Sequence, residues 1–432
     1  MKNPAHSGRT SLYMKEALLS TAIGGAIAGA AVTWLWLRRR HRRPTATSSP
    51  PPPRQPWTLD RPARIAVCGA GWWSQGWHLP HLWRNEHAEI AAIVEPASRP
   101  RSAISDLESV AELGKRYNTP TFASVDELLS SGIQLDGVLV CTSHASHFEV
   151  GSKALAKGLH VLMEKPMTTD VDEAIKLAEL AAAAHAKGKT YFMVNNTANW
   201  RTQSMVARQW VQAGRIGTVE HVLCVMHSPL LWLFDDPANV GWTKPTGKMA
   251  GNGFGYGQAS HILAFAFQVG GLTPSEAFCA MTRSAASGAD MTDAAVIKCT
   301  NGATICFSGA GSVPGNAHAD ETTNENVHST GKHISVRIFG SEGMIEYEGD
   351  DQDESSGKLL LRPRDGPVEV RDGFLFENYA QEGTGPESLQ AFIDACGGLT
   401  PYVGVDAAVG CDVVKALDAM YRSALSGQSV RM

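Results

Sequence analysis

The stretch that most constrains the fold is RIAVCGAGWWSQGWHLP, which runs from Arg64 to Pro80. It begins with an apolar run typical of a buried strand, passes through Gly69 and Gly71, and continues into residues that can form a helix. In a dinucleotide-binding unit this order gives a tight turn that lets the backbone approach a pyrophosphate at the helix N-terminus. Ser74 stands at the third position of the fingerprint, where its small side chain still allows close packing. Two glycines alone could equally be an ordinary turn at the end of a strand.

An acidic residue at the end of the next apolar run supports the cofactor interpretation. Glu95 closes EIAAIVE, twenty-four residues after Gly71. Its carboxylate can accept hydrogen bonds from both ribose hydroxyls of an adenosine and would repel a 2′-phosphate, which favours NAD over NADP. Arg99 and Arg101 follow closely and could bind a phosphate instead, so NADP remains an alternative.

The order of apolar runs predicts two folded domains. Strand-like runs at 64–68, 89–95, 135–142, 160–165 and 190–195 alternate with helical stretches such as 102–117 and 171–187. Asp170 is a suitable N-cap for the second of these helices. This alternation predicts an α/β doubly wound parallel sheet of the Rossmann kind. After residue 196 strand-like runs separated by turn signals predict an α+β domain with an antiparallel sheet, closed by two helices.

The N-terminal region differs from these domains. Residues 17–37 carry no charge and would form a helix roughly 30 Å long, enough to cross a bilayer. RRRHRR follows at 38–43, and the positive-inside rule then places the folded part in the cytosol. A cleaved signal peptide or an organelle transit peptide is the alternative. The predicted parts are a tail (1–16), a single-pass transmembrane anchor (17–37), a basic and proline-rich linker (38–60), a dinucleotide-binding domain (61–195) and a second domain (196–432).

Overall charge and histidine spacing indicate what the chain does not need. A net charge of −5 among 432 residues gives no electrostatic footprint for nucleic acid. The histidines show no spacing typical of metal ligands, so we expect no metal site.

The run MEKPM, at 163–167, ends the strand predicted at 160–165. Pro166 restricts Lys165 to an extended conformation, and the carboxyl ends of parallel strands line the ligand crevice. Lys165 is therefore expected to point to the nicotinamide, where an ammonium group can stabilise alkoxide charge or relay a proton. Glu164 is expected to point to the other face of the sheet. A surface ion pair at a strand end is the structural alternative for this run.

Several stretches resemble one family of oxidoreductases. AVCGAGWWSQGWHLP, DGVLVCTSHASHFEVGSKALAKGLHVLMEKP and QAGRIGTVEHV are similar to the glucose–fructose oxidoreductase/inositol dehydrogenase (Gfo/Idh/MocA) family, from about Arg64 to the C-terminus. The resemblance implies a Rossmann domain followed by a domain with an open-faced β-sheet. It also implies hydride transfer between a nicotinamide and a sugar, cyclitol or related alcohol, and assembly of copies through the open sheet.

The resemblance assigns roles to individual residues. Lys165 matches the catalytic lysine of the family. Thr142, Ser143 and His147 match a motif written T-P-x-x-x-H that lies along the cofactor, with Ser143 in place of the proline. Glu164 is counted with the cofactor-binding residues. Trp72 and Trp73 are expected to pack against neighbouring loops or, alternatively, to shield the cofactor.

One departure from the family lies in the second domain. The family carries D-x-x-x-H there; His261 matches the histidine as a second catalytic residue, but Gly257 stands at the aspartate position. Tyr256, Gln258 and Asn196 are candidates for substrate contacts, and Asn195 and Asn196 lie where the sixth strand of the family delivers residues to the cleft. The missing carboxylate keeps open a second interpretation, a dinucleotide-binding sensor or regulatory protein that has lost turnover, whereas Lys165 favours an enzyme.

Overall fold

The structure is a computed structural model that describes residues 57–313, 331–350, 353, 356–374 and 386–432. The predicted tail, anchor and most of the linker lie outside the described residues, so the anchor stays a prediction. Within the described ranges, no helix has the length and apolar character needed to cross a membrane. All of these ranges belong to one compact unit.

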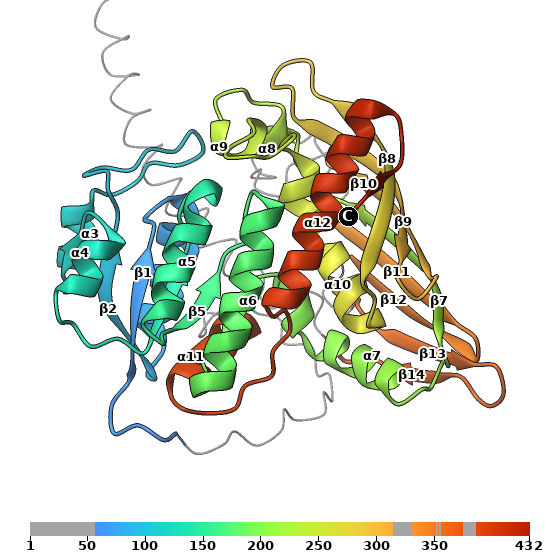
Figure 1. Cartoon of the computed structure of the whole chain (residues 1–432), viewed down its shortest axis with the longest axis horizontal. Helices are drawn as coiled ribbons and strands as arrows, with labels where there is room; N and C mark the ends of the chain where they lie inside the picture. The colour runs from blue at the N-terminus through green and yellow to red at the C-terminus, as the bar shows by residue number, and fades with distance from the viewer. Residues whose placement is uncertain (1–56, 314–330, 351–352, 354–355, 375–385) are drawn as a thin grey trace, which may run out of the picture. The chain divides into compact units, whose positions relative to one another are not determined.

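The first half of the described chain forms the predicted parallel sheet (Figure 1). Its strand order β3-β2-β1-β4-β5-β6 is that of a doubly wound fold, in which the order reverses beside β1. The strands are β1 (Ala63–Cys68), β2 (Ala88–Val94), β3 (Thr121–Phe122), β4 (Gly137–Val140), β5 (His160–Met163) and β6 (Phe192–Val194). Their side chains are almost all buried, as expected for a sheet with both faces covered.

Three helices of this half, α3 (Val110–Arg116), α4 (Val125–Ser130) and α6 (Val171–Gly188), begin at side-chain caps. The predicted cap of α6 is present, because the Asp170 carboxylate accepts from the Glu173 N–H. The helix expected from residue 102 instead begins later, as α3, because Ser109 and Glu112 form a capping box there. The others are α2 (Leu79–Arg84) and α5 (His147–Ala156), with a π-helix η1 (Ser74–His78) before α2 and a 3₁₀-helix η2 (His144–Ser146) before α5.

The second half forms a nine-stranded sheet in the order β14-β13-β12-β11-β7-β10-β9-β8-β15. The expectation of a purely antiparallel sheet is wrong at one pair, because β7 and β10 are parallel. A long crossover through helices separates β7 from β8, which lets β7 insert between β10 and β11. The strands are β7 (Val219–His227), β8 (Pro274–Arg283), β9 (Asp290–Cys299), β10 (Thr304–Ala310), β11 (His333–Gly340), β12 (Gly343–Asp350), β13 (Leu359–Pro363), β14 (Glu369–Arg371) and β15 (Val430–Arg431).

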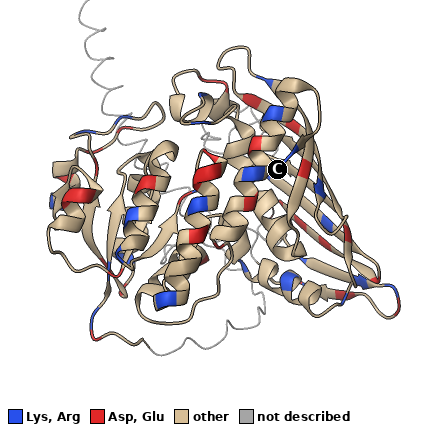
Figure 2. Ribbon diagram, in the orientation of Figure 1, with Lys and Arg blue, Asp and Glu red and all other residues tan. Residues whose placement is uncertain are grey.

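Helices cover one face of this sheet. α10 (Ser260–Gly270) contacts β7, and α12 (Ala407–Ser426) packs along β8 and beside α6, as Figure 1 shows. Positive and negative side chains are mixed along α6 and α12 (Figure 2). The remaining helices are η3 (Thr197–Trp200), α7 (Thr202–Gln212), α8 (Leu231–Phe234), α9 (Val240–Thr243), the π-helix η4 (Gly255–Ala259) and α11 (Glu387–Cys396).

The helix α11 returns to the first sheet. Its residues Leu389, Phe392 and Ile393 belong to the same apolar cluster as Ile65 of β1. A Cβ at Gly137 of β4 would lie 2.8 Å from the Phe392 ring, so this helix packs directly against the strand backbone. The parallel sheet is thus covered by a segment that the sequence assigned to the second domain.

Candidate active site

The two glycines of the first turn have different surroundings. Gly69 has φ of 95°, and a Cβ there would lie 2.2 Å from the Cys141 carbonyl oxygen, so only glycine fits. A Cβ at Gly71 would meet no protein atom within 4 Å. Packing therefore explains Gly69 but not Gly71, and the open space beside Gly71 fits the close approach of a pyrophosphate.

Glu95 lies where the fingerprint predicts. Its carboxylate accepts from the Ala70 N–H at 3.0 Å, within the glycine turn, and from the Ala97 N–H at 3.1 Å. Arg99 instead donates to Glu112 at 2.9 Å, so its guanidinium is engaged by α3. The charge beside the turn is thus the Glu95 carboxylate, which fits NAD better than NADP.

Lys165 follows β5 and points toward the second domain. Its Nζ donates to the Gly257 carbonyl oxygen at 2.8 Å and lies 4.7 Å from the centre of the Trp242 ring. Burial lowers the lysine pKa to about 8, although the charge of Glu164 acts in the opposite direction. An ammonium group has three N–H donors. One faces the Gly257 carbonyl and one the Trp242 ring, so one remains for a reacting oxygen.

Glu164 is buried behind Lys165. Its Oε1 accepts from His78 Nε2 at 2.8 Å, Asn195 Nδ2 at 2.7 Å and Trp73 Nε1 at 3.0 Å. Burial alone would raise the pKa of Glu164, but His78 above all, then Asn195 and the charge of Lys165, hold it at about 2. Since this oxygen is fully engaged, the Glu164 carboxylate supports the crevice from behind.

The π-helix η1 gives the residues after the glycine turn their directions. It carries Ser74 and His78 inward, and both side chains are buried. Trp73 is fixed by its bond to Glu164, and Trp72 packs edge-on against it with ring centres 5.3 Å apart. Both tryptophans thus pack against neighbouring groups, and both side chains stay half-exposed.

His147 joins two loops at the crevice. Its Nδ1 lies 2.8 Å from the Pro166 carbonyl oxygen, and its Nε2 lies 3.2 Å from that of Thr142. The ring is completely buried, and burial lowers its pKa. Ser143 is exposed, with its hydroxyl 3.2 Å from that of Ser146. His147 thus holds the end of β4 against the turn that carries Lys165.

His261 lies in the first turn of α10. Its pKa falls well below the usual range, first because of burial and then because of the nearby Lys165 charge. Its ring is therefore neutral near pH 7. At Gly257, a Cβ would lie only 2.6 Å from Cζ of Phe234. The Phe234 ring thus occupies the place into which an aspartate side chain would project.

Three candidates for substrate contacts are placed differently. Tyr256 is 1% exposed and stacks on Tyr421 with ring centres 5.1 Å apart, so its predicted contact does not fit the structure. Asn196 is also buried and donates to the Ser260 carbonyl oxygen at 3.2 Å, which makes it a structural link. Gln258 is half-exposed beside Gly257 and remains a candidate.

Sequence reasoning missed His78, Trp242 and Phe234. His78 could have been found from its helical distance to the glycine turn only if the π-helix had been foreseen. Phe234 lies in the short helix α8 and Trp242 in α9, where no motif marked them. Asn195, predicted to reach the cleft, instead holds Glu164 and accepts from Ser388 at 2.6 Å.

Comparisons with known proteins agree with this architecture. Residues 63–194 match the model described as "Oxidoreductase family, NAD-binding Rossmann fold", and residues 205–346 match that of the "GFO/IDH/MocA C-terminal domain". Inositol 2-dehydrogenase 1 of Paenarthrobacter aurescens is 31% identical over 153 residues, 35% of this chain and 42% of that protein. UDP-N-acetylglucosamine 3-dehydrogenase of Acidithiobacillus ferrooxidans is 34% identical over 122 residues, 28% and 34% of the two chains. This chain thus aligns with less than half the length of these curated relatives.

Solved structures share the whole fold at low identity. GenD2 from gentamicin A biosynthesis, crystallised with NAD, has a TM-score of 0.63 and 20% identity and covers 89% of this chain and 99% of its own. An aldose-aldose oxidoreductase from Caulobacter crescentus has a TM-score of 0.60 and 18% identity, with 86% and 100% covered. At these identities the likeness shows the fold alone.

Proposed function

Since the chain belongs to the Gfo/Idh/MocA oxidoreductase family, we propose that it is an NAD-dependent enzyme that oxidises or forms an alcohol by hydride transfer. The observation that carries the proposal is the placement of Lys165. Its ammonium group lies at the end of β5, bound to a carbonyl of the second domain, with its pKa lowered to about 8. A lysine with that pKa can accept or return a proton near neutral pH.

Different residues of the crevice would bind the cofactor and transfer the proton. Nicotinamide, when bound, supplies the hydride acceptor or donor. Gly71, Glu95 and the start of the following helix would hold the dinucleotide. In alcohol oxidation the substrate would lose a hydride to that acceptor and a proton from its hydroxyl group as the C=O bond forms, and Lys165 would accept the proton. His261, whose pKa lies well below the usual range, is proposed as the second residue to hydrogen-bond the same oxygen.

The substrate class follows from the relatives. The curated relatives named above are dehydrogenases of inositol and of UDP-N-acetylglucosamine. We therefore propose a sugar, a cyclitol or a related polyol for this chain. NADH formation, followed by absorbance over a panel of inositols, sugars and nucleotide sugars, would identify it.

Replacing Lys165 tests the catalytic proposal. Lys165→Met should lower kcat at least a hundredfold, as expected for loss of a proton-transfer group. The affinity for NADH should change little, because Gly71 and Glu95 lie elsewhere. If wild type and variant bind NADH alike and neither turns over any alcohol, the proposal of an enzyme would be wrong. The regulatory interpretation that Gly257 suggests would then take its place.

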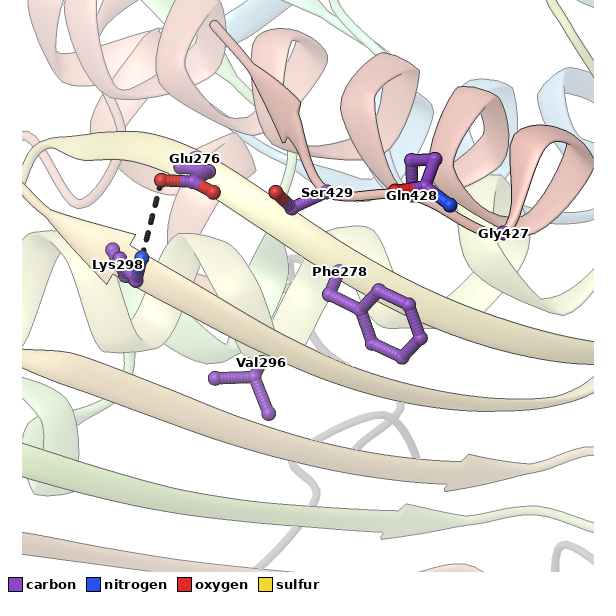
Figure 3. A pocket seen from close by; sticks show the side chains of 7 residues that line it. All are labelled: Glu276, Phe278, Val296, Lys298, Gly427, Gln428 and Ser429. Carbon is purple, nitrogen blue, oxygen red and sulfur yellow. Dashed lines mark hydrogen bonds and ion pairs between the residues drawn. The ribbon is translucent and has the colours of Figure 1, made fainter.

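Association of copies through the nine-stranded sheet is a second part of the proposal. The face opposite α10 and α12 exposes Phe278 and Val296, at 46% and 44%. Both line the shallow hollow of Figure 3, beside the Lys298–Glu276 ion pair at 3.2 Å. Phe278→Asp should convert a homo-oligomer into smaller species in analytical ultracentrifugation; an unchanged sedimentation coefficient would place the contact elsewhere.

The N-terminal anchor is the third part. We propose that residues 17–37 form a single transmembrane helix that holds the catalytic part at the cytosolic face of a membrane. The full chain should then resist carbonate extraction, whereas a chain lacking residues 1–57 should be released. Recovery of a shortened mature protein from cells would indicate cleaved targeting instead.

A further inference from the structure

Glu164 is a buried carboxylate whose charge can act on a ligand without direct contact. It lies at the carboxyl end of β5, is 7% exposed, and binds three donors through one oxygen. Its second oxygen accepts only from the Lys165 backbone N–H, at 3.2 Å, within the described part of the chain. Its effect on a ligand depends on the net charge of the carboxylate together with its donors.

The donors to Glu164 differ in the charge that they can carry. The indole of Trp73 and the amide of Asn195 are neutral groups. His78 donates through Nε2, and its Nδ1 is buried without a hydrogen-bond partner among the described residues. The low pKa of Glu164, about 2, keeps this carboxylate ionised near neutral pH.

The field of Glu164 extends through the crevice. It opposes the lowering of the pKa that burial causes at Lys165, and it does the same at His144, His147 and His261. Lys165 follows β5, and the three histidines lie in η2, α5 and α10. Ligands of doubly wound parallel sheets bind at the carboxyl ends of the strands.

We propose that Glu164, by its charge alone, makes the crevice bind the oxidised nicotinamide more tightly than the reduced one. The inference rests on the proposed NAD-dependent function. The nicotinamide ring is positively charged before it accepts a hydride and neutral afterwards, so a fixed anion stabilises only the oxidised form. Lys165 opposes this effect, and without Glu164 the crevice would be left with a net positive charge. Because only the oxidised form is stabilised, bound NAD⁺ becomes a weaker hydride acceptor, and the equilibrium on the enzyme shifts toward carbonyl reduction.

The test compares the affinities of the two cofactor forms. Dissociation constants for NAD⁺ and NADH are measured by calorimetry at pH 6, where Lys165 is protonated. Glu164→Gln should raise the ratio Kd(NAD⁺)/Kd(NADH) about tenfold, the effect of one charge within about 10 Å at an effective dielectric constant of about 20. Glu164→Asp keeps the charge and should keep the ratio. Glu95→Gln, at the adenosine end, should weaken both forms alike.

A second variant, which should shift the ratio in the opposite direction, keeps the inference testable if Glu164→Gln misfolds. Lys165→Met leaves Glu164 in place and removes the opposing charge, so the ratio should fall by a similar factor. An unchanged ratio in either Glu164→Gln or Lys165→Met, with cofactor still bound, would overturn the inference. Failure of the wild-type chain to bind either form would instead overturn the proposed function. Equal shifts in Glu164→Gln and Glu164→Asp would show that hydrogen bonding, and not charge, sets the preference.

Discussion

The most direct test of the packing around the crevice is Gly257→Ala. A Cβ at this position would lie 2.6 Å from Cζ and 3.1 Å from Cε1 of Phe234, whereas ordinary contacts begin near 3.4 Å. Phe234 is completely buried and packs edge-on against Phe254, with ring centres 6.5 Å apart, so it has little room to retreat. Forcing one methyl group into such packing costs about 1–3 kcal/mol.

A second term acts in the opposite direction. Gly257 lies within the π-helix η4, and alanine is favoured over glycine in helices by about 0.5–1 kcal/mol. Gly257→Ala alone should therefore lower the free energy of unfolding by about 1–2 kcal/mol. In a Phe234→Leu background the collision is removed, and the same change should be neutral or slightly stabilising. The coupling energy between the two sites should then be about 1–3 kcal/mol.

Urea unfolding of the four proteins, followed by circular dichroism, gives these free energies. An equal cost of Gly257→Ala in both backgrounds would show that Phe234 is not what excludes a side chain at this position. A coupling energy below about 0.5 kcal/mol would have the same meaning, since that is the scatter of independent sites. The absence of an aspartate would then need an explanation outside packing.

Three other predictions concern the glycine turn, the lysine and the second domain. Gly71→Ala meets no protein atom, so unfolding should change by less than about 0.5 kcal/mol, while titration calorimetry should show weaker NAD binding. The kcat for alcohol oxidation should rise with pH through about 8 as Lys165 loses its proton, and a pH–rate profile without that limb would contradict its role as base. Tyr421→Phe removes the 2.6 Å bond to Asp290 and should lower the free energy of unfolding by about 1–3 kcal/mol in urea titrations.

The sequence predicted the parallel sheet because its signals are local. The predicted strands are apolar runs, whereas the short β3 (Thr121–Phe122) was not predicted, and the helix after Asp170 starts at a cap that can be read from a few residues. The glycine turn and Glu95 were also predictable, since the fingerprint fixes their order and distance along the chain. Lys165 followed from its place at the end of a strand.

Long-range packing limited the rest. Nothing local distinguishes Tyr256, which stacks in the core, from Gln258, which is half-exposed, because the π-helix η4 alters the directions of successive side chains. The parallel pairing of β7 with β10 depends on a crossover whose path no short motif specifies. His78 likewise reaches Glu164 only through the π-helix η1.

The position of α11 has a consequence for synthesis on the ribosome. Residues 387–396 cover β1 and β5, two strands that are translated some 230 to 320 residues earlier. Until that helix emerges from the exit tunnel, the apolar side chains of the parallel sheet that it covers stay exposed on the nascent chain. Folding of the dinucleotide domain therefore finishes late in translation, and chaperones that bind nascent apolar segments have a long interval in which to act.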